Sequence, residues 1–359
     1  MFTKNDRHNS FTLLTIFAVF GLAIFAFGAA NTANAQANKG TYLDFTGDGK
    51  TDWVTIRTYL QPPDYAYRWK ILGNPASPVP NEAFIRIFDY GRVADVVLAG
   101  DYNGDRKTDL TVWRPGSQGI FYSAQFPTGS GGITLDRAVP WGTGNDNSVV
   151  QGDYDGDGKL DFTVARYNAD NSLTWYILGS STNVMRAVDF GFRGGRPKLG
   201  ADFTGDGRDE FVFTSFDVNG GLTFYIGDAV TGKLVLIRQW GYRDGFIDRS
   251  LPPADYTGDG KADFVAVRLN VSPMVWYILD PATNTSTATR FGFGFSNVGN
   301  DQPIRGDYDG DGRQDIAVYR ERNHIFYVLR SSDGGITTQH WGEDGDSALD
   351  ISQIFFSID

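Results

Sequence analysis

The sequence predicts an all-β protein, a β-propeller of six four-stranded blades, with seven blades as the alternative. An acidic stretch rich in Asp and Gly returns six times, at intervals of about 50 residues, which is the length of one propeller blade. Between the copies lie short segments rich in β-branched and aromatic residues, punctuated by Gly and Pro and without helical periodicity. Four such segments per unit match one blade, because each blade is a four-stranded sheet.

Each unit follows the same order of segments. An apolar strand comes directly after the acidic stretch, as in DFTVAR at residues 161–166, and a second strand surrounds an aromatic pair such as Trp175-Tyr176. A third strand ends in an aromatic residue followed by Gly. These pairs are Tyr90-Gly91, Trp141-Gly142, Phe190-Gly191, Trp240-Gly241, Phe291-Gly292 and Trp341-Gly342. The first of these strands is apolar on both faces, which is expected where neighbouring blades cover both sides of a sheet.

We expect a signal peptide at residues 1–35 and a single propeller domain at residues 36–359. Lys4 and Arg7 precede an apolar run at residues 11–30, and Ala33-Asn34-Ala35 matches a signal-peptide cleavage site. An uncleaved membrane anchor is the alternative, since the run approaches the roughly 20 residues that span a bilayer. After cleavage the chain is expected to be secreted, periplasmic or held at the cell surface, without insertion in a membrane.

The six repeats define the expected blades. Their limits are about residues 44–100, 101–152, 153–201, 202–254, 255–306 and 307–359. The last residues, 350–359, resemble the strand that leads into an acidic stretch, but no seventh stretch follows. We expect this segment to pair within the blade that holds the N-terminus, because a closed ring leaves few exposed strand edges.

Composition excludes several classes of partner and chemistry. The formal net charge is −11 and no basic cluster is present, so the phosphates of a nucleic acid would be repelled. The chain has no cysteine, which excludes disulfides, thiolate catalysis and thiolate zinc sites. Any cross-link that stabilises the fold must therefore be of another kind.

The acidic stretches have the ligand spacing of a calcium loop. Numbered from its first Asp, the third copy has Asp153, Asp155, Asp157 and Asp161 at positions 1, 3, 5 and 9, and Gly158 at position 6. Alternating oxygens turn inward around a hard cation, the backbone carbonyl of position 7 adds a ligand, and Gly permits the sharp turn. The predicted ligands, Lys and Arg through their carbonyls, are Asp44, Thr46, Asp48, Lys50, Asp52; Asp101, Asn103, Asp105, Lys107, Asp109; Asp153, Asp155, Asp157, Lys159, Asp161; Asp202, Thr204, Asp206, Arg208, Glu210; Asp255, Thr257, Asp259, Lys261, Asp263; and Asp307, Asp309, Asp311, Arg313, Asp315.

The loops resemble those of FG-GAP or VCBS repeats, the family of integrin alpha-type calcium-binding propellers. An EF-hand would need a helix and a Glu at position 12, whereas position 12 here is a strand residue such as Thr55 or Val112. The resemblance covers roughly residues 40–359 and rests on the acidic loop combined with the aromatic-Gly pair. It implies a propeller fold, calcium ligation and an extracytoplasmic location, and nothing catalytic.

Differences among the copies rank the expected sites, of which there are up to six. The loops at Asp153 and Asp307 carry four carboxylates and are expected to bind calcium most strongly, since ligand charge sets affinity. The loop at Asp101 has Asn103 at position 3 and Arg106 at the Gly position, and is expected to be weakest. Turns without any metal are the alternative, which leaves the fixed offsets of the carboxylates unexplained.

Other recurring residues suggest a second role. An Arg stands thirteen residues after the first Asp in five units, where it would either bind a sugar together with aromatic side chains or hold an adjacent carboxylate; we favour the structural role. These residues are Arg57, Arg114, Arg166, Arg268 and Arg320, with Ser215 in the fourth unit. Trp113 and Tyr319 occupy an otherwise small or aliphatic position and are candidates for contact with an exposed ligand.

The predicted function is an exported, calcium-binding propeller that serves as a binding or adhesion module for an extracellular protein or carbohydrate. A carbohydrate-active propeller enzyme and a propeller lectin are the alternatives. Outside the signal peptide the only histidines are His324 and His340, which lack zinc-ligand spacing, and no G-x-S-x-G motif is present. We therefore expect no enzymatic activity.

Overall fold

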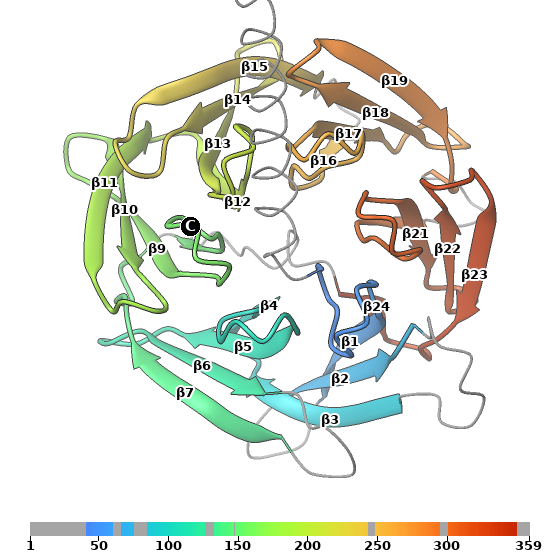
Figure 1. Cartoon of the computed structure of the whole chain (residues 1–359), viewed down its shortest axis with the longest axis horizontal. Helices are drawn as coiled ribbons and strands as arrows, with labels where there is room; N and C mark the ends of the chain where they lie inside the picture. The colour runs from blue at the N-terminus through green and yellow to red at the C-terminus, as the bar shows by residue number, and fades with distance from the viewer. Residues whose placement is uncertain are drawn as a thin grey trace, which may run out of the picture.

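Six sheets surround a central axis (Figure 1). The structure is a computed structural model that describes residues 41–59, 66–74, 85–125, 133–146, 148–242, 248–294 and 301–349. Within these residues every regular element is a strand, and the strands form six four-stranded antiparallel sheets. The prediction of a six-bladed β-propeller is confirmed. This part of the chain contains no helix long and apolar enough to span a membrane.

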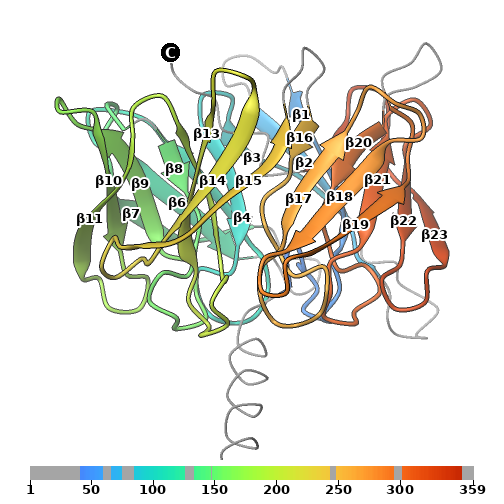
Figure 2. The ribbon, with the colours of Figure 1, turned by 90° about the horizontal axis from the view of Figure 1, so that it is seen from above.

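Each blade runs from an innermost strand at the axis to an outermost strand at the rim (Figures 1 and 2). Blade 1 contains β24 (Ser347–Ala348), β1 (Trp53–Tyr59), β2 (Ala66–Leu72) and β3 (Ile85–Arg92); blade 2 contains β4 (Val96–Gly100), β5 (Asp109–Arg114), β6 (Ile120–Gln125) and β7 (Thr134–Pro140); and blade 3 contains β8 (Ser148–Val150), β9 (Phe162–Tyr167), β10 (Ser172–Leu178) and β11 (Met185–Phe192). Blade 4 contains β12 (Arg196–Ala201), β13 (Glu210–Phe216), β14 (Gly221–Gly227) and β15 (Leu234–Tyr242); blade 5 contains β16 (Asp248–Ser250), β17 (Phe264–Arg268), β18 (Val275–Asp280) and β19 (Thr285–Arg290); and blade 6 contains β20 (Asp301–Ile304), β21 (Ile316–Arg320), β22 (Ile325–Leu329) and β23 (Ile336–His340).

The acidic loops lie between the innermost and second strands of the blades. Each sequence repeat therefore supplies three strands to one blade and the innermost strand of the next. Blade 1 is completed from the other end of the chain, where β24 pairs with β1 through Thr55 opposite Ala348 and Ile56 opposite Ser347. A C-terminal strand thus closes the ring, although it precedes the segment 350–359 predicted for this role, which lies outside the described residues.

Burial follows the position of each strand in its blade. The second strands are buried on both faces, as in β9, where all four residues from Phe162 to Ala165 are buried. The outermost strands alternate between exposed and partly buried residues, as in β3 and β23. This difference explains why the second strands are continuous apolar runs, since neighbouring blades cover both of their faces.

Aromatic side chains connect neighbouring blades. The indole N–H of Trp141 in blade 2 donates to the carbonyl oxygen of Tyr176 in blade 3 at 3.2 Å, and that of Trp341 in blade 6 donates to Lys70 in blade 1 at 3.2 Å. These two Trp residues belong to aromatic-Gly pairs, so members of this recurring pair join one blade to the next.

The aromatic residue at position 2 of the acidic loop also packs across a blade boundary. We number the acidic loops 1 to 6 in chain order. Tyr102 in loop 2 stacks on Phe162 of blade 3 with ring centroids 5.3 Å apart, and Tyr308 in loop 6 stacks on Trp53 of blade 1 at 4.6 Å. All four side chains are at most 6% exposed. The conformation of each acidic loop is therefore tied to the packing of two blades.

Candidate metal centres

The first Asp of each loop organises the loop backbone. In loop 3, Asp153 Oδ1 accepts hydrogen bonds from the backbone N–H groups of Gly156 and Asp157, at 2.7 and 3.1 Å, and its Oδ2 accepts one from Gly158 at 3.0 Å. Gly156 and Gly158 have φ values of +78° and +87°, in the left-handed region that glycine adopts without steric cost. The position-1 carboxylate and the two glycines thus set the course of the turn.

The carboxylate at position 9 ties the loop to the outer part of its own blade. Asp161 Oδ2 accepts the N–H of Tyr154 and its Oδ1 accepts the N–H of Ser180, both at 3.0 Å. The equivalent bonds join Asp52 to Asn74 at 2.8 Å and Asp315 to Ser331 at 2.7 Å. The predicted site omits these hairpin residues. Asn74, Ser180 and Ser331 each lie two positions after the Leu that ends β2, β10 or β22, the third strand of its blade. This spacing is the feature of the sequence from which these residues could have been found.

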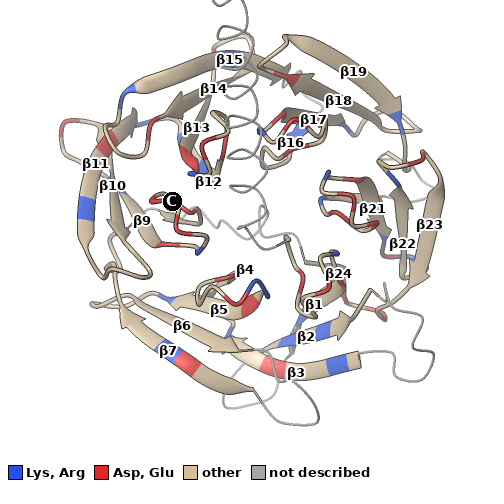
Figure 3. Ribbon diagram, viewed as in Figure 1, with Lys and Arg blue, Asp and Glu red and all other residues tan. Residues whose placement is uncertain are grey.

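Three of the loops bring carboxylates together. In each of them, three carboxylate oxygens lie within 4.8 Å of one another, a separation compatible with shared binding of one hard cation. The groups are Asp44, Asp48 and Asp52; Asp153, Asp155 and Asp161; and Asp307, Asp309 and Asp311. The described residues of loops 2, 4 and 5 form no such group of three. Figure 3 shows acidic residues of the loops on the inner side of the ring of sheets.

The residue at position 3 decides how the loop pairs its polar atoms. In loop 2, Asn103 Nδ2 donates to Asp109 Oδ1 at 2.8 Å, and in loop 4, Thr204 Oγ1 donates to Glu210 Oε1 at 3.1 Å. In loop 3, Asp155 Oδ1 is shielded from solvent and has no hydrogen-bond partner. A shielded carboxylate oxygen without a partner is costly, so the oxygen-rich donor set of loop 3 fits a hard divalent cation.

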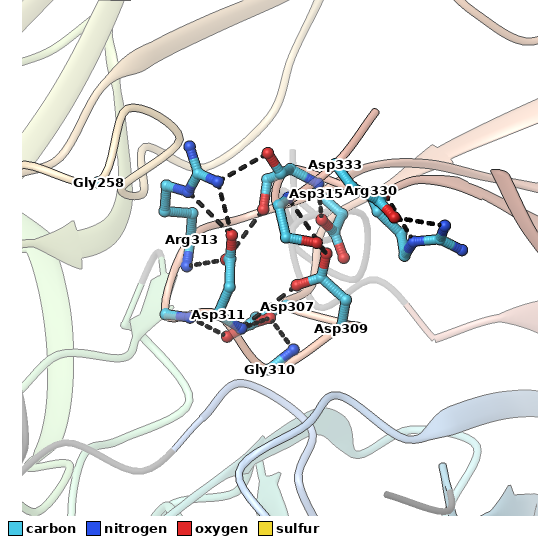
Figure 4. A network of polar contacts seen from close by, with 12 residues as sticks. Gly258, Asp307, Asp309, Gly310, Asp311, Arg313, Asp315, Arg330 and Asp333 are labelled. Atoms are coloured by element: carbon cyan, nitrogen blue, oxygen red, sulfur yellow. Dashed lines mark hydrogen bonds and ion pairs between the residues drawn. The ribbon is translucent and has the colours of Figure 1, made fainter. Parts of the chain in front are cut away.

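In loop 6 the carboxylates also bind neighbouring side chains. Asp311 Oδ2 pairs with Arg313 Nη2 at 2.7 Å (Figure 4), and Asp311 Oδ1 accepts the hydroxyl of Ser331 at 2.9 Å. Asp309 Oδ2 accepts the hydroxyl of Ser332 at 2.6 Å. A cation in loop 6 must therefore compete with bonds that loop 3 lacks, although both loops carry four carboxylates.

Burial raises the pKa of the position-9 carboxyl groups. The pKa of Asp161 is raised to about 7 chiefly by burial, with the charges of Asp155 and Asp153 adding to the shift and the hydrogen bond from the N–H of Ser180 opposing it. The pKa values of Asp52, Asp109, Glu210 and Asp263 are likewise raised to about 7 and that of Asp315 to about 6, with burial the largest cause. A bound cation would offset this cost because it stabilises the ionised form.

A backbone hydrogen bond joins each acidic loop to the preceding one. The N–H of position 8 donates to the carbonyl oxygen of position 1. The six bonds, of 2.7 to 2.8 Å, run from Thr51 to Asp307, Thr108 to Asp44, Leu160 to Asp101, Asp209 to Asp153, Ala262 to Asp202 and Gln314 to Asp255. The bond from loop 1 to loop 6 completes the circle, so the six loops form one continuous ring.

The Lys or Arg at position 7 reinforces this ring. Its side chain lies over the Gly at position 4 of the preceding loop, so that a Cβ atom added to Gly47 would be 2.7 Å from Cε of Lys107, and one added to Gly156 would be 2.5 Å from Cγ of Arg208. The contact recurs in all six loops. The sequence interpretation used position 7 for its carbonyl alone, whereas the structure shows that the side chain also packs against the neighbouring loop.

The recurring arginines form ion pairs near the ends of the second strands that lie away from the acidic loops. Arg114 donates from Nε and Nη2 to the two carboxylate oxygens of Asp95, each at 2.8 Å. The other pairs are Arg320 with Asp301, Arg166 with Asp146, and Arg57 with Glu343 and Asp346. Blade 4 lacks both partners, with Ser215 and Gly195 at the equivalent positions. The structural interpretation is confirmed for these four arginines.

Trp113 and Tyr319 are buried, so the prediction that they contact an exposed ligand is wrong. Trp113 is 3% exposed and its Nε1–H donates to the carbonyl oxygen of Trp141 at 3.0 Å. Tyr319 is 0% exposed and packs against Phe326 with ring centroids 4.6 Å apart. Both side chains lie on second strands, whose two faces are covered by neighbouring blades.

The two histidines outside residues 1–35 lie close together in blade 6. The rings of His324 and His340 have centroids 6.2 Å apart, and His324 Nε2 lies 3.2 Å from Asp344 Oδ1. Pairing of β22 with β23 causes this proximity, since Ile325 lies opposite His340. The groups of three metal-binding side chains found in the described part of the chain do not include this pair.

Comparison with family models finds a match in part of the chain. Residues 202–266 and 255–318 match the model of the FG-GAP-like repeat, and these segments contain loops 4, 5 and 6. Among curated proteins, none matches the sequence.

Similar solved structures include three bacterial proteins. A protein of Bacteroides fragilis provisionally identified as a 6-phosphogluconolactonase has 11% identity and a TM-score of 0.40, over 85% of this chain and 99% of that one. AztD of Citrobacter koseri has 10% identity and a TM-score of 0.35, over 82% and 96%. A protein from Lactobacillus plantarum has 11% identity and a TM-score of 0.34, over 82% and 98%. At these scores the three similarities have no bearing on function.

Proposed function

We propose that this FG-GAP-repeat propeller is an exported protein whose acidic loops bind calcium and whose surface serves as a binding or adhesion module. The observation that carries the calcium assignment is the shielded, unpaired Oδ1 of Asp155, in a loop where Asp153 and Asp161 lie within ligand distance. Carboxylates, a threonine or asparagine oxygen and a backbone carbonyl are the ligands that Ca²⁺ prefers.

Calcium would stabilise the fold through two connections of each loop. The position-2 aromatic residue, such as Tyr308, inserts between two blades, and the position-1 carbonyl accepts the hydrogen bond from the next loop. A cation that neutralises the buried carboxylates removes their mutual repulsion and favours the loop conformation that both contacts need. The chain has no cysteine, so the ion would act where other exported proteins use disulfides.

The test is thermal unfolding with and without metal. We expect a chelator to lower the unfolding temperature and added Ca²⁺ to restore it, because a ligand that binds only the folded state stabilises that state. Protein treated with chelator already saturated with Ca²⁺ is the control. An unchanged unfolding temperature after elemental analysis has verified metal removal would show that calcium has no structural role.

A further inference from the structure

A cavity lies at the end of the innermost strands, among loops 4, 5 and 6. It has a volume of about 890 Å³, and its wall includes Tyr42, Arg305 and Gln314 together with the position-1 Asp of these loops. This volume is in the range of small-molecule sites, about 300 to 1,000 Å³. We call it the channel-mouth cavity. A smaller cavity of about 160 Å³ adjoins it and shares Tyr42 and Arg305.

The wall includes residues from two positions at which the six units differ, taken mainly from units 4, 5 and 6. Two positions before each first Asp stand Tyr42, Ala99, Gln151, Gly200, Pro253 and Arg305. At position 8 stand Thr51, Thr108, Leu160, Asp209, Ala262 and Gln314. Every position-8 residue donates its backbone N–H to the position-1 carbonyl of the preceding loop. This bond constrains the backbone at position 8 and places no requirement on the side chain. These two positions give the cavity a chemistry that no single repeat has.

Arg305 and Gln314 each place a shielded, unsatisfied polar atom in this wall. Within the described part of the chain, the guanidinium of Arg305 makes no hydrogen bond or ion pair, and it packs over the ring of Tyr42 at 3.9 Å. Arg305 Nε and Gln314 Oε1 are both shielded from solvent without a hydrogen-bond partner. The wall therefore offers a donor and an acceptor that reorientation toward a ligand would satisfy, next to a flat surface formed by Tyr42 and Arg305.

The charges of the wall restrict the ligand. Five carboxylates, Asp202, Asp209, Asp255, Asp307 and Asp311, line the cavity against three cations, Lys261, Arg305 and Arg313. Without bound Ca²⁺, this excess of carboxylates would repel an anionic ligand. A neutral hydroxylated ligand is not repelled in either state, accepts hydrogen bonds from Arg305 and donates them to Gln314.

We propose that the channel-mouth cavity binds a neutral carbohydrate, with Arg305 and Gln314 hydrogen-bonded to its hydroxyl groups and a sugar ring packed against the stacked side chains of Tyr42 and Arg305. The inference rests on the proposed function as a binding module, and it adds the class of ligand and the place where it binds. The hydroxyl groups supply the donors and acceptors that the wall lacks, and the C–H face of a sugar ring matches the flat surface formed by Tyr42 and Arg305.

The test is saturation-transfer NMR of the whole protein, with and without Ca²⁺, with maltotriose, cellotriose, xylotriose and mannotriose, and with trigalacturonate as the anionic comparison. We expect transfer to at least one neutral trisaccharide in both conditions, and at least tenfold weaker binding of trigalacturonate when Ca²⁺ is absent. Arg305→Ala and Tyr42→Ala are expected to weaken binding at least tenfold. Arg290→Ala is the matched control. Arg290 is an exposed residue at the end of β19, an outermost strand, so its substitution removes the same charge away from the cavity wall. Gln314→Leu is a third variant, in case Tyr42→Ala fails to fold.

Three outcomes overturn the inference: no transfer to any neutral trisaccharide, equal binding of trigalacturonate in the absence of Ca²⁺, or binding of the neutral sugar that survives Arg305→Ala. The unfolding temperature of the same samples, with and without chelator, separates this inference from the proposed calcium role. Absent sugar binding with an intact calcium effect counts against the inference alone. Sugar binding without any calcium effect counts against the calcium role alone.

Discussion

The backbone N–H of Thr51 donates a 2.7 Å hydrogen bond to the carbonyl oxygen of Asp307, which joins the first acidic loop to the sixth. The two residues are far apart in sequence, yet the bond is equivalent to the five that link consecutive units. Position 1 uses its side chain to fold its own loop and its carbonyl to hold the next loop. The metal-binding loops are therefore mechanically connected around the whole ring.

Replacing the position-1 residue of one loop should loosen its neighbour. Asp153→Ala removes the carboxylate that accepts three N–H groups within loop 3, and the Asp153 carbonyl also holds the N–H of Asp209. We expect protection of the Asp209 amide against hydrogen exchange to fall about tenfold, which corresponds to about 1.4 kcal/mol of local opening. The amide of Thr51, on another part of the ring, is the internal control. Unchanged protection at Asp209 would contradict the coupling.

Arg106 occupies a backbone conformation that suits Gly. Its φ is +67°, whereas the Gly residues at position 6 of the other loops, such as Gly158 at +87°, adopt this region without a side chain to clash. We expect Arg106→Gly to raise the free energy of unfolding by about 1 kcal/mol in urea titrations. Arg106→Ala removes the same charge but keeps a Cβ atom, so it should give no gain. Equal stabilisation by Ala and Gly would attribute the effect to charge instead of backbone strain.

Asp155→Asn should separate the stability of the empty loop from its affinity for metal. An Asn at position 155 can donate a hydrogen bond to Asp161, as Asn103 donates to Asp109 in loop 2. This bond would replace the unpaired, shielded Oδ1 of Asp155 by a paired amide group. In chelator we expect the variant to unfold at a higher temperature than the parent protein. Its affinity for Ca²⁺ should fall about tenfold, since a charged ligand is lost. The measurements are thermal unfolding and calcium titration calorimetry.

Asp170→Asn, in the turn after β9, makes the same charge change away from the acidic loops and serves as control. It should leave the calcium-dependent rise in unfolding temperature as in the parent protein. A full calcium-dependent rise in Asp155→Asn would mean that Asp155 is not a ligand.

The Arg–Asp pairs can be tested with the natural exception in blade 4. Arg114→Ser leaves the Asp95 carboxylate buried, at 4% exposure, without its bidentate partner, and we expect a loss of about 3 kcal/mol in the free energy of unfolding. The double variant Asp95→Gly/Arg114→Ser copies Gly195 and Ser215. Both variants lose the packing of Arg114 over Tyr122, so their difference reports on the unpaired carboxylate, less the hydrogen bond that Asp95 Oδ2 accepts from the N–H of Arg92 at 2.8 Å. The double variant should therefore be the more stable one by denaturant titration; the reverse order would show that the pair is not what stabilises this end of the blade.

The predictable part of this protein is the part that repeats. The offsets of Asp and Gly in each loop, and the apolar second strands, reflect local backbone requirements that must be met six times, so the blades and the loops could be predicted from the sequence alone. Contacts between units could not, because the bond from Thr51 to Asp307 and the burial of Trp113 depend on how neighbouring sheets face one another. The proximity of His324 and His340 likewise depends on the register of β22 and β23, which residue types do not specify.

The offset between repeat and blade affects the order in which the protein can be completed during synthesis. Blade 1 begins with β1 near the start of the domain but receives its innermost strand, β24, only when Ser347 and Ala348 have been made. Until then β1 presents an unpaired edge, which is a template for pairing with another chain. The first blade begun is thus the last one finished, and a nascent chain remains open to misassembly until β24 has been translated.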